Sequence, residues 1–165
     1  MTFRLSKILL VAAVALFHTL VVFNNTTDYF SNFQYVVHVL DMDTTYPGND
    51  GMWRALRSPV VDHIFYVSII AWEILIMILC WVGAGRLFGA WHKSVAEFNF
   101  AKRLPVVALT LSLLLWLVAF LSVGGEWFLM WQSKIWNGQE SASRMFTVVG
   151  IVLLLLVMPE SETQP

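Results

Sequence analysis

Charged residues are scarce in this sequence: Asp, Glu, Lys and Arg make up 13% of its 165 residues, about half their share in an ordinary soluble domain. Hydrophobic residues make up 58%, and the mean hydropathy is +0.70. An apolar excess on this scale excludes a soluble globular protein. It also excludes intrinsic disorder, which requires low hydrophobicity and a high net charge. The composition therefore predicts an integral membrane protein.

The sequence also lacks a charge imbalance and has almost no cysteine. Ten basic residues stand against eleven acidic ones, so there is no basic field, and nucleic acid is not an expected partner. The only cysteine, Cys80, has no second cysteine for an intrachain disulfide. Because Cys80 lies within an apolar run, we expect it to pack as a small buried hydrophobe.

Four segments are apolar for nearly the length of a membrane span, which is about 20 residues for a hydrocarbon core about 30 Å thick. They cover residues 5–23, 63–83, 104–124 and 143–158. The first is expected to be a retained helix rather than a cleaved signal peptide, because Asn24 and Asn25 follow it where small cleavage-site residues would stand. The expected fold class is all-α: an integral membrane four-helix bundle forming a single domain, with short interfacial helices in its two external loops.

The distribution of Lys and Arg predicts the orientation. Six lie at the amino terminus and in the 84–103 loop: Arg4, Lys7, Arg86, Lys93, Lys102 and Arg103. Four lie on the opposite side: Arg54, Arg57, Lys134 and Arg144. The positive-inside rule then places both termini in the cytoplasm, with external loops at 24–62 and 125–142.

The first external loop is too long for a simple connection. Its apolar residues recur at helical spacing: Phe30, Phe33, Val37 and Leu40. This spacing predicts a short interfacial helix, with Asp28 or Ser31 as its cap. The aspartates that follow do not have the spacing of a calcium-binding EF-hand loop, so turns explain them better, and no metal is expected.

Aromatic and charged residues of both external loops form a candidate interaction surface: Trp53, Arg54, Arg57, Glu126, Trp127, Trp131 and Trp136. Arg54 and Arg57, three residues apart, are expected on one helical face, paired with loop aspartates or lipid phosphates; the alternative is a clamp for an anionic ligand. Trp127, Trp131 and Ile135 also fit one face of a helix at headgroup depth. A partner protein or planar cofactor stacked on the tryptophans is the alternative to that membrane belt.

Glu73 is the most informative single residue, because it lies near the middle of its span. A carboxylate at that depth is costly and usually faces the bundle interior. Its expected neighbours are Ser112 at similar depth and His18 one to two turns nearer the outside. These three residues form a candidate site for a proton or a cation, or else a polar contact that joins two helices. Haem held by His18 and His63 is disfavoured because their expected depths differ.

Several longer strings resemble a known family. They are Met42-Asp43-Thr44-Thr45-Tyr46-Pro47-Gly48-Asn49, Met52-Trp53-Arg54, Ser58-Pro59, Ala71-Trp72-Glu73, Gly124-Gly125-Glu126-Trp127-Phe128, Met130-Trp131-Gln132-Ser133 and Trp136-Asn137-Gly138-Gln139. Nearly the whole chain resembles a bacterial family of predicted small integral membrane proteins (domain of unknown function twenty-one sixty-five). The resemblance implies a bacterial inner-membrane protein, and it brings no catalytic residue with it.

The expected role is non-enzymatic. We expect an accessory or scaffold component of a membrane complex, in contact with the lipid bilayer and with a membrane-protein partner or a second copy of the chain. The alternative is an oligomeric transporter or channel unit that uses Glu73. Nucleophilic catalysis is disfavoured because no nucleophile elbow or catalytic triad spacing is present. No cofactor is expected either.

Overall fold

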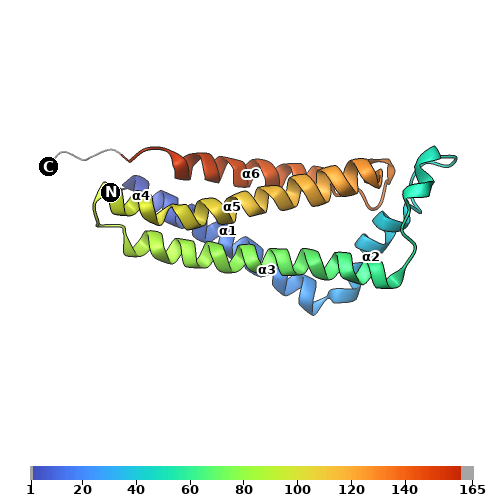
Figure 1. Cartoon of the computed structure of the whole chain (residues 1–165), viewed down its shortest axis with the longest axis horizontal. Coiled ribbons are helices and arrows are strands. Elements are labelled where there is room, and N and C mark those ends of the chain that lie inside the picture. The colour runs from blue at the N-terminus through green and yellow to red at the C-terminus, as the bar shows by residue number, and fades with distance from the viewer. Residues whose placement is uncertain (1, 161–165) are drawn as a thin grey trace.

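Four long apolar helices run side by side in the computed structural model, which describes residues 2–160 (Figure 1). They are α1 (Thr2–Thr27), α3 (Pro59–Gly89), α5 (Arg103–Leu114) with its continuation η2 (Leu115–Trp127), and α6 (Gln139–Val157). The short helix α4 (Val95–Ala101) leads into α5 at the end of the bundle that holds the amino terminus, which we call the terminal end. The helix α2 (Tyr29–Asp41) lies at the opposite end, the loop end. The described residues contain no strand, so the expected all-α fold is confirmed.

The helices mostly extend beyond the apolar segments that predicted them. The first runs from Thr2 to Thr27 rather than over 5–23, and the second from Pro59 to Gly89 rather than over 63–83. A helix satisfies its backbone hydrogen bonds in water as well as in lipid, so it need not end where the hydrocarbon ends. Pro59 is at the first helical position of α3, where its missing N–H costs nothing.

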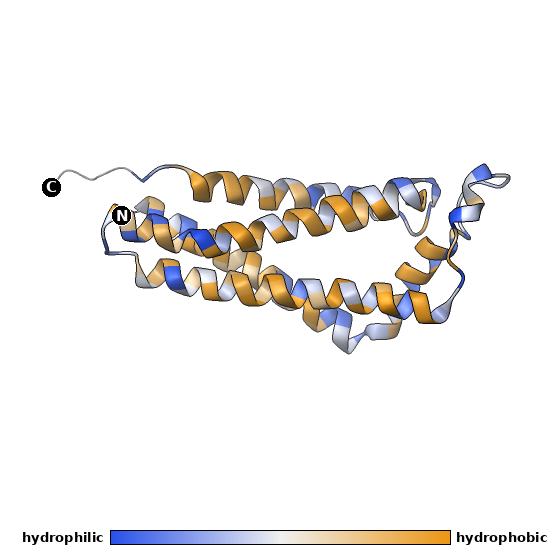
Figure 2. Cartoon of the chain, viewed as in Figure 1, coloured by the Kyte–Doolittle hydropathy of each residue, from blue (hydrophilic) through white to orange (hydrophobic). Residues whose placement is uncertain are grey.

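Small and branched residues fill the bundle interior. Val11, Ala15, Ile76, Cys80 and Ala108 are all fully buried, so the expected burial of Cys80 is confirmed. Apolar residues also cover the outside of the helices, and polar ones gather toward the ends (Figure 2). An apolar surface around buried small side chains is typical of helices packed within a bilayer.

The helix α2 confirms that the first external loop contains a helix, but it turns a different face to the bundle than expected. Phe33 and Leu40 are buried as expected, whereas Phe30 is 73% exposed. Val36 and Val39 take the remaining buried positions. The difference arises because α2 packs against α3, where Phe33 stacks on His63 with ring centroids 4.2 Å apart.

The expected helix through Trp127, Trp131 and Ile135 is wrong. The π-helical stretch η2, in which the N–H of Phe128 donates to the carbonyl of Val123 five residues earlier, ends at Trp127. Leu129 then takes a left-handed conformation with φ of 55°, and only the single turn η3 (Met130–Gln132) follows. The three side chains therefore do not share one helical face.

Hydrogen bonds join the two connections at the loop end. The first contains the short helix η1 (Asp50–Arg54), which begins after Asn49. Gln132 accepts hydrogen bonds through Oε1 from the Tyr46 N–H at 3.0 Å and from Asn49 Nδ2 at 3.3 Å. Thr44 donates to Ser133 Oγ at 2.8 Å. These contacts join two of the strings that resemble the family, at residues 42–49 and 130–133.

Candidate functional site

A cavity of about 380 Å³, lined by both polar and apolar side chains, opens at the loop-end half of the bundle, between α1, α2, α3, η2 and the start of α6. We call it the Glu73 chamber. Its polar lining comprises Asn25, Asn32, Tyr35, Tyr66, Glu73, Asn137 and Ser141. Several polar groups converging within a cavity of this size form the usual setting of a small-molecule or ion site.

Glu73 is only 2% exposed, and its carboxyl group forms part of the chamber wall. Its Oε2 accepts a hydrogen bond from Asn25 Nδ2 at 2.8 Å, while Oε1 accepts none from residues 2–160. The carbonyl of Asn25 in turn accepts a bond from the Tyr66 hydroxyl at 3.2 Å. Asn25 therefore orients the carboxyl group, whose second oxygen has no hydrogen-bond partner among the described residues.

His18 and Ser112 form a separate contact rather than joining Glu73. Their Nε2 and Oγ atoms are 2.9 Å apart, and both side chains are fully buried. Because Glu73 bonds Asn25, seven residues after His18 on α1, its carboxyl is about 10 Å of helical rise nearer the loop end. The expected order of depth was therefore wrong, since α1 extends to Thr27 and brings Asn25 into the bundle.

Two side chains missed by the sequence analysis complete the chamber. The indole Nε1 of Trp116 is buried at its wall and donates no hydrogen bond within residues 2–160. Burial raises the pKa of Tyr35 to about 12, although a hydrogen bond with Gly138 opposes the rise. The Tyr35 hydroxyl is therefore protonated at neutral pH, and it donates to Met130 Sδ at 2.7 Å.

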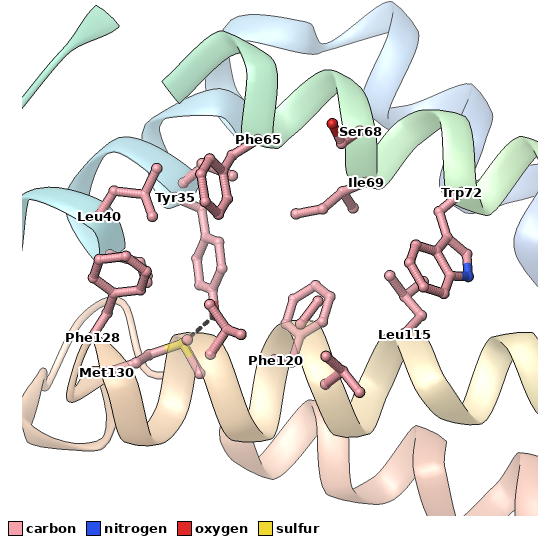
Figure 3. A pocket seen from close by; sticks show the side chains of 16 residues that line it. Tyr35, Leu40, Phe65, Ser68, Ile69, Trp72, Leu115, Phe120, Phe128 and Met130 are labelled. Atoms are coloured by element: carbon pink, nitrogen blue, oxygen red, sulfur yellow. Dashed lines mark hydrogen bonds between the residues drawn. The ribbon is translucent and has the colours of Figure 1, made fainter. Parts of the chain in front are cut away.

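A second cavity lies behind one wall of the chamber. It has a volume of about 240 Å³, is almost entirely apolar, and opens between α3 and η2 beside Phe65, Trp72 and Val118, all exposed on the outside of the bundle (Figure 3). Four side chains line both cavities: Tyr35, Val36, Ile69 and Phe120. A single layer of side chains thus separates the polar chamber from the apolar surface of the spanning helices.

Part of the candidate interaction surface does come together around Arg54. Its Nη1 donates to the carbonyl of Trp127 at 3.0 Å and to that of Glu126 at 3.3 Å. The guanidinium also lies 5.6 to 5.8 Å from the rings of Trp127 and Trp53, which meet edge to face. Arg54 thus joins the two loop-end connections through carbonyls and rings, and not through loop aspartates as expected.

The other members of that surface lie apart from Arg54. Arg57 is exposed in the segment after η1, so the two arginines do not share a helical face. Trp131 packs edge to face on Tyr46, and Trp136 stacks on His38 with centroids 4.6 Å apart. His38 also bonds the Asp43 carboxylate at 2.7 Å. The residues of the predicted interaction surface therefore form several separate local contacts and not one continuous surface.

The chamber residues carried a weak signal in the sequence. Asn25 lies seven residues after His18, so both occupy one face of a long helix. The sequence indicates this shared face only if the first helix is extended past residue 23 into the polar residues that follow. Asn137 and Ser141 come from the far loop, and only the folded chain brings them near Glu73.

A bundle of four apolar helices with a buried carboxyl defines an integral membrane protein of the multi-spanning α-helical class. The chain belongs to the family of predicted small integral membrane proteins (DUF2165), whose model matches residues 3–159. This match confirms the resemblance of the sequence strings. No curated protein and no solved structure matches the chain significantly.

Proposed function

We propose that this protein binds a proton or a small cation at Glu73 and does so without catalysing a reaction. The observation that carries the proposal is the open chamber that reaches a buried carboxyl group with one oxygen unpaired within residues 2–160. Buried acids inside spanning helices usually mark a pathway for protons or ions. Asparagine and tyrosine oxygens in the chamber wall are suited to a cationic ligand, because each can accept a hydrogen bond from that ligand.

The proposed orientation places the chamber opening outside the cytoplasm. The positive-inside rule places the terminal end, with six Lys and Arg, in the cytoplasm of a bacterial inner membrane. The ligand then enters from the external side. A single four-helix unit encloses little volume, so we expect passage across the membrane to require an oligomer.

Infrared titration of the purified protein tests the role of Glu73. We expect a carboxylic acid band that disappears in Glu73→Gln and converts to carboxylate when methylammonium is added at constant pH. Methylammonium binds at least about tenfold more weakly to Glu73→Gln, because a hydrogen bond to a charged group contributes about 1.5–3 kcal/mol. Glu126→Gln, an exposed acid at the same end, is the matched control. A band that responds to neither pH nor cation contradicts the proposal.

Cysteine labelling tests access to the chamber. In a Cys80→Ser background, Val21→Cys places a thiol in the chamber lining, and Val11→Cys places one in the closed core of the same helix. A membrane-impermeant maleimide should label Val21→Cys from the loop side only and should leave Val11→Cys unlabelled. Equal protection of both thiols would show that the chamber is closed.

A second candidate role rests on large hydrophobic side chains that are exposed at the loop end. Trp53 is 75% exposed, Trp131 43% and Ile135 74%. These side chains suit an accessory protein that docks on a membrane partner or on a second copy of itself. Sedimentation in mild detergent measures self-association directly, and Ile135→Asn should reduce it if the loop end forms the contact.

A further inference from the structure

Three basic side chains surround one carboxylate at the terminal end, opposite the Glu73 chamber. Glu160 Oε1 lies 2.6 Å from Lys7 Nζ and 2.7 Å from Lys102 Nζ, and Oε2 lies 3.5 Å from Arg4 Nε. All four side chains are at least 86% buried. Both lysines also donate to the carbonyl of Met158 at the end of α6. The cluster therefore joins α1, the start of α5 and the end of α6.

The charges of this cluster do not balance within residues 2–160. Glu160 neutralises one of three cations, which leaves two positive charges in excess. Arg4 donates hydrogen bonds through Nη1 to the carbonyls of Trp91 and Lys93. Its Nη2 has no hydrogen-bond partner among the described residues. Buried charges are costly unless they are paired, so the excess favours an anionic ligand.

A groove of about 280 Å³ lies directly against these cations, between α1 and α6. One wall is charged and contains Arg4, Lys7 and Glu160. The other wall is apolar and contains Phe3, Leu10 and Leu155. Phe3 is 80% exposed, so the apolar wall continues onto the outer surface of the spanning helices.

We propose that this terminal groove binds one anionic phospholipid. Its phosphate lies at Arg4 and Lys7, and the upper part of an acyl chain lies along Phe3, Leu10 and Leu155. The charge excess attracts the phosphate, and basic pockets between spanning helices at the headgroup boundary are suited to anionic headgroups. A free phosphate ion would leave the apolar wall without a function.

Native mass spectrometry of the whole protein, released from detergent with a mixture of phosphatidylglycerol and phosphatidylcholine, tests the site. We expect a one-lipid adduct with phosphatidylglycerol in preference to phosphatidylcholine. Arg4→Gln should weaken that adduct about fivefold, because one basic residue contributes about 1 kcal/mol to anionic lipid binding. Arg4→Lys keeps the charge and should restore most of the affinity.

Two further variants separate the groove from general surface charge. Arg86→Gln removes an exposed positive charge outside the groove and should leave the one-lipid adduct nearly unchanged. Ser6→Trp fills the groove without altering its charge and should reduce the adduct as strongly as Arg4→Gln. Equal retention of both lipids, an equal loss in Arg86→Gln, or full displacement of the lipid by inorganic phosphate would overturn the proposal.

Discussion

Gly138 allows Tyr35 to close one side of the Glu73 chamber. A Cβ atom at this position would collide with the Tyr35 hydroxyl and would lie 3.0 Å from its Cζ atom. The φ of Gly138 is −93°, which any residue can adopt, so the restriction comes from the neighbouring side chain and not from the backbone. Tyr35 of α2 and Gly138, which directly precedes α6, thus set the shape of this wall of the Glu73 chamber.

Gly138→Ala should therefore lower the free energy of unfolding by about 1–3 kcal/mol, the usual cost of overpacking. In a Tyr35→Phe background the same substitution should cost clearly less, because the colliding hydroxyl is gone. Unfolding of the four proteins of this double-mutant cycle in mixed detergent micelles gives the coupling energy. Gly150→Ala on α6, where the nearest atom is 3.9 Å away, is the control. Additive effects would show that the two positions do not meet.

The helices α3 and α5 approach each other closely where a glycine faces a proline. A Cβ atom at Gly83 would lie 2.9 Å from Pro105 Cβ, and the proline ring is too rigid to move aside. Helices in a bilayer gain most of their association energy from such close packing, because lipid offers no hydrophobic driving force between them.

Gly83→Ala should separate these helices locally and destabilise the protein by about 1–3 kcal/mol. Gly85→Ala, two residues along α3, has open space at its Cβ and should be neutral or slightly stabilising, since alanine is the better helix former. Both can be measured by unfolding in mixed micelles. The hypothesis of a tight α3–α5 contact fails if the two substitutions cost the same.

The sequence predicted the helices well and the connections poorly. Long apolar runs identified all four spanning helices, because the hydrocarbon thickness demands them. The same reasoning missed the loop end, where Leu129 adopts a left-handed conformation and Gln132 bonds two distant groups. Such contacts depend on residues more than 80 positions apart, and no local pattern contains them.

The sequence predicted the central residue of the candidate site, Glu73, but not the residues that surround it in the chamber. Glu73 was singled out because an acid in an apolar run is conspicuous, and the structure does place it in a polar chamber. His18 was given the wrong depth because the end of α1 was set at the last apolar residue. Asn25, the group that bonds Glu73, lay beyond that limit.

At the scale of the whole molecule, Glu160 holds the terminal end together. It contacts basic residues on α1 and at the start of α5 from a position just after α6. Burial alone would raise the pKa of Glu160, but hydrogen bonds and charges from Lys102 and Lys7 bring it below its ordinary value. The ionised form is therefore the one that stabilises the folded chain.

When the pKa of a group is lower in the folded state than in the unfolded state, the ionised group stabilises the folded state at any pH above its unfolded pKa. For a glutamate the unfolded pKa is about 4.3. The stabilisation is lost as the pH falls through the lower pKa of the folded state. Glu160→Gln should therefore lower the free energy of unfolding by about 3 kcal/mol at neutral pH, because it leaves buried cations without their carboxylate. The difference from the unmodified protein should shrink once the pH falls below the ordinary range of a glutamate. Thermal unfolding in detergent across this pH range measures it, with Glu140→Gln at the exposed start of α6 as control. A pH-independent difference would mean that Glu160 acts through packing and not through its charge.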